Sequence, residues 1–305
     1  MADTSFRVSV PTESWRRALA AEDLPAGVEV LVWDGAAPAP RPAPDLVVPP
    51  YVATPDLSAL PAGCRTVQLL TIGHDGVPEQ LPAGVLLCNA AGVHETSTAE
   101  LAVGLAIAAL RGLDGDVRAM ADGRWGASRR TSLADRRVLV LGWGGVGRAV
   151  AARLAPFEVE LTAVAARARV QDGVPVHSVD ELPALLPHHD VVVLACPLTE
   201  ATRGLVDAAF LAAMPDGALL VNVARGPVVR TAALLDELRT GRLRAALDVT
   251  DPEPLPAGHE LWSAGVIVTP HVGGNSTAFR PRMVRLLREQ VRRHLAGQEP
   301  LNLVR

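Results

Sequence analysis

From Arg137 to Pro270 the chain alternates short apolar runs with segments whose apolar residues repeat every three or four positions. The apolar runs are rich in Val, Leu and Ala and predict buried strands. They are RVLVL (137–141), VELTAVA (159–165), DVVVLAC (190–196), ALLVNVA (218–224), RAALDV (244–249) and VIVTP (266–270). Helices are expected between most of them, for example TAALLDELRTG (231–241). Strands that alternate with helices predict a parallel sheet covered by helices on both faces.

The first hundred residues carry further apolar runs, separated by Pro- and Gly-rich connectors. The runs that predict strands are VEVLVWD (28–34), DLVVPPYV (45–52), TVQLLTIG (66–73) and VLLCNA (85–90). APAPRPAPD (37–45) predicts a stiff extended connector. At 94–113 the period becomes helical, and Ser97 with Glu100 forms the pattern of a capping box at the start of the helix.

The tail RPRMVRLLREQVRRHL (280–295) predicts an amphipathic helix that covers the first domain. Its arginines are expected to form a solvated face. The apolar residues expected to share the buried face are Met283, Leu286, Leu287, Val291 and Leu295. A chain of 305 residues is long for one core, so we expect two domains.

The glycine-rich segment LGWGGVGRAV (141–150) follows a predicted strand and opens a predicted helix, GRAVAARLAPF (147–157). Gly142, Gly144 and Gly147 match the G-x-G-x-x-G pattern of dinucleotide-binding turns, and Gly145 and Val146 lie inside it. The glycines allow a tight turn, close approach of a pyrophosphate, and tight packing of helix on strand. The bulky Trp143 either covers the adenine side or packs into the core.

The end of the second strand indicates which dinucleotide binds. An NAD site places an acidic residue about twenty positions after the glycines. Here that stretch, TAVAARARV (162–170), has alanine instead, followed by Arg167 and Arg169. A small residue with arginine suits a ribose 2′-phosphate, so we expect NADP to be preferred over NAD. Alternatively, both arginines point into water.

Three polar residues follow the carboxyl ends of predicted strands, where open parallel sheets bind ligands. Arg225 suits a substrate carboxylate, which a guanidinium holds through two parallel hydrogen bonds. His271 suits proton transfer near neutral pH, and Glu253 suits orientation of its imidazole. The glycines after His271 indicate room for a ligand. Each residue alone also has a structural interpretation, but their arrival at one edge favours a reductase of 2-keto acids.

Composition excludes several other chemistries. The chain has no lysine, so a Schiff base and a Walker-type phosphate loop are excluded. Its net charge of −4 does not favour nucleic acid or an anionic membrane, and we expect neither as a partner. No leader segment is apparent, so the cytoplasm is the expected location. The three cysteines show no metal-ligand spacing, no metal is expected, and Cys88 and Cys196 are expected to be small buried residues.

Seven histidines besides His271 are present, and all except His74 are expected on the surface. Those six are His94, His177, His188, His189, His259 and His294.

Taken together, these segments resemble the D-isomer-specific 2-hydroxyacid dehydrogenase family. The segments that carry the resemblance are LGWGGVGRAV, CPLTEATRGLVD (196–207), LLVNVARGPVV (219–229), AALDVTDPEPLP (245–256), LWSAGVIVTPHVGG (261–274) and GQEPLNLV (297–304). The resemblance implies an α/β fold with two Rossmann- or flavodoxin-like domains. It implies a discontinuous substrate domain, 1–95 plus 277–305, a dinucleotide-binding domain, 96–276, and an active site between them.

The resemblance also implies roles for individual residues. Arg225 matches the carboxylate-binding arginine, Glu253 the relay glutamate and His271 the acid and base. Asp248 matches an aspartate that contacts the nicotinamide carboxamide, and the loop at 71–77 the one that receives the substrate carboxylate. The remaining positions implied are Pro197, Thr202 and Ala224 for the cofactor, and Gly73 and His74 for the substrate. Members are usually homodimers joined near 94–121. The acidic residue common after the arginine motif is replaced here by Arg230.

The predicted function is therefore hydride transfer between NAD(P)H and a small 2-keto acid such as glyoxylate or hydroxypyruvate, which gives a D-2-hydroxy acid. The alternative is a non-catalytic, corepressor-like protein that senses the dinucleotide on the same scaffold. A sensor has no need for Arg225, Glu253 and His271 together.

Overall fold

The computed structural model of the chain describes residues 5–21, 23–34, 38–51 and 56–304. Position 37 of the predicted connector and position 52 of the second predicted strand lie outside the described residues. The contacts divide the chain into two compact units. Unit 1 comprises 1–94 and 277–305, and unit 2 comprises 95–276.

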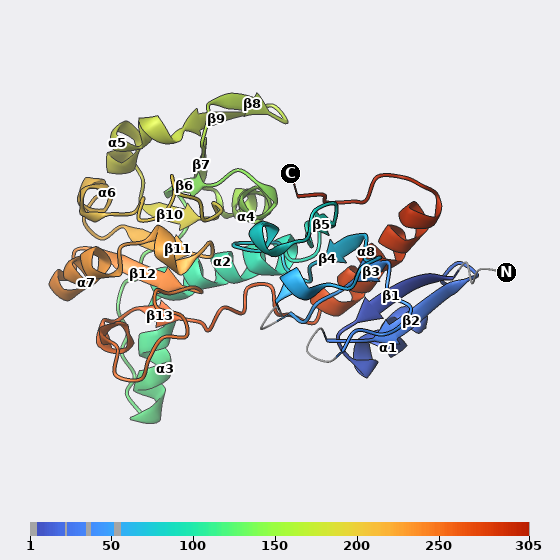
Figure 1. Cartoon of the computed structure of the whole chain (residues 1–305). Helices are drawn as coiled ribbons and strands as arrows, with labels where there is room; N and C mark the ends of the chain where they lie inside the picture. Colours follow the sequence, from blue (N-terminus) through green and yellow to red (C-terminus); the bar gives the residue numbers. More distant parts are fainter. Residues whose placement is uncertain (1–4, 22, 35–37, 52–55, 305) are drawn as a thin grey trace. The chain divides into compact units, whose positions relative to one another are not determined.

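Unit 2 contains an eight-stranded sheet (Figure 1). Its strands are β6 (Arg137–Leu141), β7 (Glu160–Ala165), β8 (Arg169–Gln171), β9 (Val174–Ser178), β10 (Val191–Leu194), β11 (Leu219–Asn222), β12 (Arg244–Leu247) and β13 (Ile267–Val268). The order is β13-β12-β11-β10-β6-β7-β9-β8, and every pairing is parallel except β8 with β9. Chain order reverses beside β6, whose neighbours are β10 and β7, as in doubly wound dinucleotide-binding sheets.

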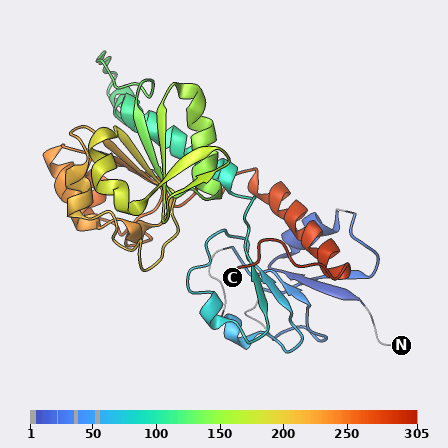
Figure 2. The same ribbon diagram turned by 90° about the horizontal axis from the view of Figure 1, so that it is seen from above.

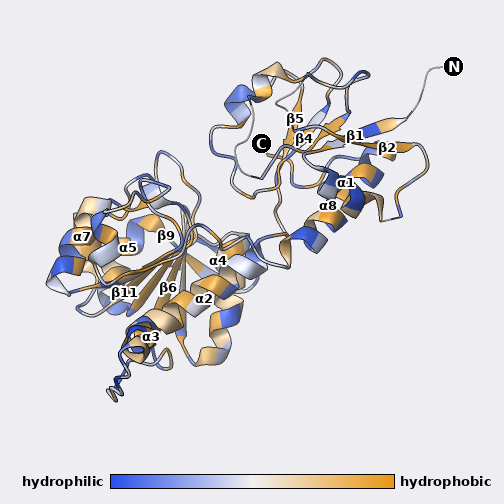
Figure 3. Ribbon diagram, turned by 90° about the horizontal axis from the view of Figure 1, so that it is seen from below, coloured by the Kyte–Doolittle hydropathy of each residue, from blue (hydrophilic) through white to orange (hydrophobic). Residues whose placement is uncertain are grey.

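Helices cover both faces of this sheet (Figure 2). One face carries α2 (Glu95–Arg111) and α4 (Gly145–Leu154), and α3 (Leu113–Ala121) continues from α2. The other carries α5 (Leu182–Leu185), α6 (Ala208–Ala213) and α7 (Thr231–Thr240). Alternate residues of β6 enter the two cores: Val138 and Val140 the core beneath α2 and α4, Leu139 and Leu141 the other. Figure 3 shows this apolar interior along β6, β11 and α2.

Unit 1 contains a five-stranded parallel sheet in the order β2-β1-β3-β4-β5, the flavodoxin-like order. Its strands are β1 (Phe6–Val10), β2 (Val28–Val32), β3 (Leu46–Val47), β4 (Thr66–Gln68) and β5 (Leu86–Cys88), and its helices are α1 (Glu13–Ala20) and α8 (Phe279–Leu295). Short 3-10 helices occur in both units: η1 (Leu57–Ala59), η2 (Pro78–Gln80), η3 (Ala155–Phe157), η4 (Val179–Glu181), η5 (Leu186–His188), η6 (Gly226–Val228) and η7 (Glu260–Ser263). The predicted α/β fold with two parallel sheets is confirmed.

The predicted capping box at the start of α2 is wrong. The helix begins at Glu95, two residues before Ser97, so Ser97 lies inside the first turn. Its buried hydroxyl instead forms a 2.6 Å hydrogen bond with the hydroxyl of Ser276. The two ends of unit 2 are therefore joined through these side chains.

Several elements were not predicted. FRVSV is β1, a buried strand near the centre of its sheet, and α1 follows it behind an N-cap at Thr12. The stretch after β7 forms the β8–β9 hairpin, because Asp172 and Gly173 both adopt positive φ at its turn. The hairpin widens the sheet by one antiparallel strand at its edge.

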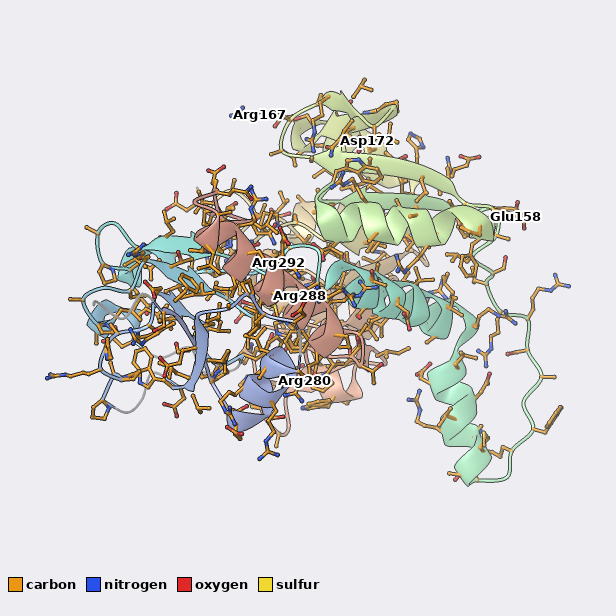
Figure 4. All side chains as sticks on the ribbon, turned by 90° about the vertical axis from the view of Figure 1, so that its right-hand side faces the viewer. Glu158, Arg167, Asp172, Arg280, Arg288 and Arg292 are labelled. Carbon is orange, nitrogen blue, oxygen red and sulfur yellow. The ribbon has the colours of Figure 1, made fainter. Side chains whose placement is uncertain are left out.

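The tail forms α8 and packs into the core of unit 1, as predicted, but its buried face differs (Figure 4). Leu295 is exposed, whereas Val284 and Gln290 are buried. Gln290 donates from Nε2 to Gln68 Oε1 at 2.6 Å and to the Leu301 carbonyl at 2.9 Å, which satisfies a buried amide. Figure 4 shows Arg280, Arg288 and Arg292 along the helix.

Two of the six histidines expected on the surface are buried. A ring nitrogen of His94 bonds the Leu70 carbonyl at 2.7 Å. His189 lies between the Leu185 carbonyl and the Thr162 hydroxyl, and burial lowers its pKa. The segment LLPHHD (185–190) does not indicate which of its two histidines is buried against the sheet.

All three cysteines are buried, as expected for Cys88 and Cys196. Burial raises the pKa of each thiol to about 11, so none is a thiolate near neutral pH. In the described part of the chain no helix alone is long and apolar enough to cross a membrane. Only the pair α2 and α3, bent by 65°, meets that criterion when the two are joined.

Candidate active site

The glycine-rich turn lies where β6 ends and α4 begins, at the point where strand order reverses. Gly142 has a φ of 109°. A Cβ added there would lie 2.5 Å from the backbone of Ala195, just beyond β10. Only glycine allows the ends of these neighbouring strands to approach so closely.

The other two glycines of the motif have different surroundings. A Cβ on Gly147 would lie 1.8 Å from the Gly142 carbonyl oxygen, so Gly147 is needed for the helix to pack on the turn. Gly144 is the N-cap of α4, with no side-chain cap, and a Cβ there would meet nothing within 4 Å. Open space in front of an uncapped helix N-terminus suits a pyrophosphate. Trp143 packs into the core beneath α2 and α4.

The two arginines after β7 differ in their partners. Arg167 is exposed in the bend between β7 and the β8–β9 hairpin, and Figure 4 labels it together with Asp172 of the hairpin turn. Arg169 donates from Nε and Nη2 to Gln171 Oε1, at 3.0 and 2.8 Å. Arg148, which follows Gly147, pairs with Asp172 at 3.1 Å and ties α4 to the hairpin. Arg169 is therefore held along its own strand, whereas Arg167 stands at the strand end where a nucleotide ribose is expected.

The loop after β10 contains Pro197 and Thr202 and is ordered by the threonine. Its hydroxyl donates to the Pro197 carbonyl at 2.7 Å and accepts from the Thr199 N–H at 2.8 Å. Farther along, the Gly204 and Val206 N–H groups donate to the Pro227 and Val228 carbonyls. This loop is thereby joined to the segment that follows Arg225.

Arg225 lies half-buried after β11, preceded by the buried Ala224. Its Nη1 donates to the Ala224 carbonyl at 2.8 Å. The next residue, Gly226, presses against the chain after β12: a Cβ there would lie 1.8 Å from the Thr250 carbonyl oxygen. The segment carrying Arg225 therefore crosses the segment that leads to Glu253 in direct backbone contact.

Glu253 and His271 are hydrogen bonded to each other through Glu253 Oε1 and His271 Nδ1. Both side chains are part-exposed, 39% and 44% respectively. The bond fixes the imidazole orientation and leaves Nε2 as the ring nitrogen for a reacting group.

Asp248 is buried and accepts three hydrogen bonds from the segment around His271. Its Oδ1 accepts from Thr269 Oγ1 at 2.6 Å and from the Val272 N–H at 2.9 Å, and its Oδ2 accepts from the Gly273 N–H at 2.8 Å. A Cβ on Gly273 would lie 2.9 Å from Oδ2. The expectation that the glycines after His271 make room for a ligand is thus wrong for Gly273, whose space is filled by this carboxylate.

The predicted site residues of unit 2 all lie in segments after β6, β7, β10, β11, β12 and β13, at the carboxyl edge of its sheet. Gly73 and His74 belong to unit 1, in the loop after β4. There His74 Nδ1 lies 3.4 Å from the Ile72 carbonyl, which also accepts from Asn89 Nδ2 at 3.0 Å. A substrate-binding role for Gly73 and His74 stays a prediction.

Sequence reasoning missed the residues that hold the site together. These are Gly226, Thr250, Thr269 and Gly273. The sequence shows Gly226 between Arg225 and a proline, but it does not show that Gly226 lies against Thr250.

Comparison with known proteins places the chain in a family. Residues 103–273 match the model of the "D-isomer specific 2-hydroxyacid dehydrogenase, NAD binding domain". The chain is 31% identical to a glyoxylate reductase of Thermofilum pendens over 252 residues, 79% of this chain and 74% of that protein. It is 30% identical to the human glyoxylate reductase/hydroxypyruvate reductase over 253 residues, 79% of this chain and 77% of the human protein.

Solved structures of similar proteins support the same family. A D-isomer specific 2-hydroxyacid dehydrogenase from Xanthobacter autotrophicus Py2, in complex with NADPH and MES, matches with a TM-score of 0.83 at 30% identity, over 99% of this chain and 98% of that one. An NADPH-dependent glyoxylate/hydroxypyruvate reductase from Sinorhizobium meliloti, in complex with NADP and sulfate, matches with a TM-score of 0.83 at 26% identity, over the same shares. The chain belongs to the D-isomer specific 2-hydroxyacid dehydrogenase family.

Two glycine substitutions separate nucleotide binding from packing. Gly144→Ala places a methyl group where a pyrophosphate is expected, without a clash in the protein. We expect the free energy of unfolding to change by less than about 0.5 kcal/mol, while NADPH binding, measured by fluorescence titration, weakens about tenfold or more. Gly226→Ala, the matched substitution, should lower the free energy of unfolding by about 2 kcal/mol or more through its clash with Thr250. Unchanged NADPH binding in a folded Gly144→Ala variant would contradict the assignment of the turn.

Proposed function

We propose that this chain is an NAD(P)-dependent D-2-hydroxyacid dehydrogenase that reduces a small 2-keto acid, of the glyoxylate or hydroxypyruvate type. One observation carries the proposal: the His271 imidazole, oriented by Glu253, lies at the same sheet edge as the glycine-rich turn after β6. The open space at Gly144 in that turn suits a dinucleotide. Relatives named for glyoxylate and hydroxypyruvate reduction support this substrate class.

In this proposal three side chains divide the work on the substrate. Arg225 holds the carboxylate and orients the adjacent keto group, because a guanidinium stays charged and binds two oxygens at once. His271 Nε2 donates a proton to the keto oxygen during reduction and accepts it during oxidation. Glu253 is hydrogen bonded to His271 Nδ1 and keeps the ring in one orientation during both reduction and oxidation.

The dinucleotide supplies the hydride when bound. Gly144 and the first turn of α4 hold its pyrophosphate, and Pro197, Thr202, Ala224 and Asp248 lie in the segments that line its path. The chain's own contribution is to fix the substrate against this edge and to move one proton.

Turnover tests the proposal and separates it from a sensor that binds the dinucleotide without chemistry. We expect oxidation of NADPH, followed at its absorbance, when glyoxylate or hydroxypyruvate is added, with D-glycerate as the product from hydroxypyruvate. His271→Ala should lower kcat about a hundredfold or more while the fold is retained. His177→Ala is the matched control, because His177 forms a similar pair with Glu181, at 2.8 Å, on the surface. Absence of turnover with a panel of 2-keto acids, despite tight NADPH binding, would favour the sensor.

We propose further that NADP is preferred over NAD. The carboxyl end of β7 has alanine where an NAD site has the acidic residue that binds ribose hydroxyls, and the exposed Arg167 follows two residues after the strand. Two solved structures of similar proteins are complexes with NADPH or NADP.

Arg167→Asp tests this preference. We expect the ratio of kcat/KM for NADPH to that for NADH to fall about a hundredfold, because a 2′-phosphate contact is replaced by repulsion. Arg169→Asp is the control and should change the ratio little, since Arg169 is held by Gln171. The same ratio before and after Arg167→Asp would contradict a contact between Arg167 and the 2′-phosphate.

We also propose that the chain forms a homodimer through α3. Apolar side chains gather on this helix and the segment after it: Leu113, Val117 and Met120 share a face and are 46%, 65% and 76% exposed, and Trp125 is 97% exposed. Figure 1 shows α3 extending away from the sheet of its unit. Apolar surface of this kind favours burial against a second copy.

Sedimentation equilibrium tests the dimer. The wild-type chain should have the mass of two copies, and Val117→Glu combined with Met120→Glu should give one, because charges would be buried in the contact. Val170→Glu is the control, since Val170 is 74% exposed on β8 and lies outside the proposed contact. A wild-type monomer, or a double variant that stays dimeric, would contradict the proposed contact.

A further inference from the structure

We infer that the segment after α8, residues 301–304, sets the position of the loop after β4, residues 71–77. Asn302 and Asn89 are the positioning residues through which this segment acts. The inference rests on the proposed function, because it gives this loop the carboxylate of the 2-keto acid to bind. All the residues concerned belong to unit 1, whereas His271 and the glycine-rich turn belong to unit 2.

The loop after β4 carries two backbone donors that the protein itself does not use. It follows a strand of a parallel sheet, at the edge where such sheets bind ligands. Among the residues that the structure describes, the N–H groups of Gly73 and His74 have no hydrogen-bond partner, and both residues are half-buried. Two successive N–H groups can hold a carboxylate, since a charged oxygen is a strong acceptor. The orientation of these donors therefore matters for a 2-keto acid.

The Asn89 side chain fixes the peptide group that carries the first of these donors. Asn89 follows β5 and donates from Nδ2 to the Ile72 carbonyl at 3.0 Å. Because a trans peptide is planar, with its carbonyl and N–H pointing in opposite directions, this bond also directs the Gly73 N–H away from Asn89. The Asn89 Oδ1 accepts from the Ala91 N–H at 3.1 Å, which holds the amide group in place.

Asn89 is in turn held by the segment 301–304, which pairs antiparallel with the end of β5, an edge strand of its sheet. The Asn302 carbonyl accepts from the Asn89 N–H at 3.1 Å, and the Val304 N–H donates to the Leu87 carbonyl at 2.8 Å. Asn302 Nδ2 donates to the Ala91 carbonyl at 2.8 Å and to the Asn89 carbonyl at 3.3 Å. Asn302 therefore contacts both the N–H and the carbonyl of Asn89.

The position of Asn302 is fixed from α8. Gln290 is fully buried on that helix. Its Oε1 accepts from the Leu301 N–H at 2.8 Å, and its Nε2 donates to the Leu301 carbonyl at 2.9 Å. Asn302 has a φ of 56°, a left-handed conformation that asparagine adopts more readily than most residues. The contacts therefore run from the core of unit 1, through Gln290, Asn302 and Asn89, to the loop.

The consequence concerns the substrate rather than the cofactor or the proton. A displaced loop binds the carboxylate less tightly in the ground state and in the transition state alike, which raises KM and leaves kcat unchanged. NADPH binding should not respond, because the glycine-rich turn is in unit 2. A residue that only stabilised unit 1 would lower the free energy of unfolding without a selective change in KM.

Asn89→Ala and Asn302→Gly test the inference in the full chain. Asn89→Ala removes the donor to the Ile72 carbonyl. We expect KM for glyoxylate or hydroxypyruvate to rise about tenfold, because a Gly73 N–H that has turned loses one hydrogen bond to a charged group. Asn302→Gly suits the positive φ and removes only the side-chain bonds, so KM should rise about threefold. In both variants kcat and the Kd of NADPH should change by less than about twofold.

Gln80→Ala is the matched control. Gln80 Nε2 donates to the Gly76 carbonyl at 2.8 Å, so this variant also removes an amide bond to the same loop. It leaves the peptide group that carries the Gly73 N–H untouched. We expect its KM to stay within about twofold of the wild-type value.

A spectroscopic readout makes the test independent of turnover. In an amide proton–nitrogen correlation spectrum of the protein without nucleotide, the Gly73 resonance can be assigned by its loss in Gly73→Ala. It should move in Asn89→Ala and in Asn302→Gly, and stay in place in Gln80→Ala. If Asn89→Ala does not fold, Asn302→Gly decides alone.

Three results would overturn the inference. The first is a folded Asn89→Ala variant with the wild-type KM and an unmoved Gly73 resonance. The second is an Asn302→Gly variant that leaves both unchanged, since the segment 301–304 would then not position the loop. The third is a rise of KM in Gln80→Ala as large as in Asn89→Ala. If the wild-type protein turns over no keto acid, the proposed function fails, but the Gly73 resonance still decides whether Asn302 positions the loop.

Discussion

The site depends on the close crossing of two backbone segments, where Gly226 lies against the Thr250 carbonyl. No side chain fits at this crossing, so the segment that carries Arg225 and the segment that leads to Glu253 cannot separate or slide without breaking the contact. Thr231 Oγ1 reinforces it by donating to the Asp251 carbonyl at 2.8 Å. This contact constrains the backbone next to Arg225 and three residues before Glu253, the two residues proposed for the site.

The crossing is the middle of a longer series of contacts along one sheet edge. The loop after β10 is bonded to the chain after Arg225, that chain crosses the segment before Glu253, and Glu253 bonds His271. Asp248 closes the series by fixing the turn around His271. Catalytic groups on loops need such support, because a displacement of about 1 Å can cost about a hundredfold in rate.

Much of this arrangement was predictable from the sequence, for physical reasons. Strands buried on both faces appear as continuous apolar runs, and parallel strands carry their carboxyl ends to one edge, so Arg225, Glu253 and His271 were expected together. The motif glycines were predictable because each position has a physical requirement: Gly142 and Gly147 avoid clashes, and Gly144 leaves open space in front of the helix.

The remainder depended on tertiary contacts that a local pattern does not contain. FRVSV alternates apolar and polar residues, which is the pattern of a half-buried strand, yet every residue of β1 is buried. β2 and β3 pair with β1 on its two sides. Ser97 has the spacing of a cap, but its hydroxyl finds Ser276, 179 positions away. Gly273 looked like space for a ligand, and the space belongs to Asp248, whose bonds to that turn span 24 and 25 positions.

The most direct measurement of the central claim is a crystal structure of the chain with NADP and oxamate, an unreactive analogue of a 2-keto acid. We expect the oxamate carboxylate to lie on the Arg225 guanidinium, with the oxamate amide oxygen, which takes the place of the keto oxygen, within hydrogen-bond distance of His271 Nε2. We also expect the His271 bond to Glu253 to be retained. Oxamate bound away from both Arg225 and His271, or a His271 ring turned from Glu253, would contradict the account.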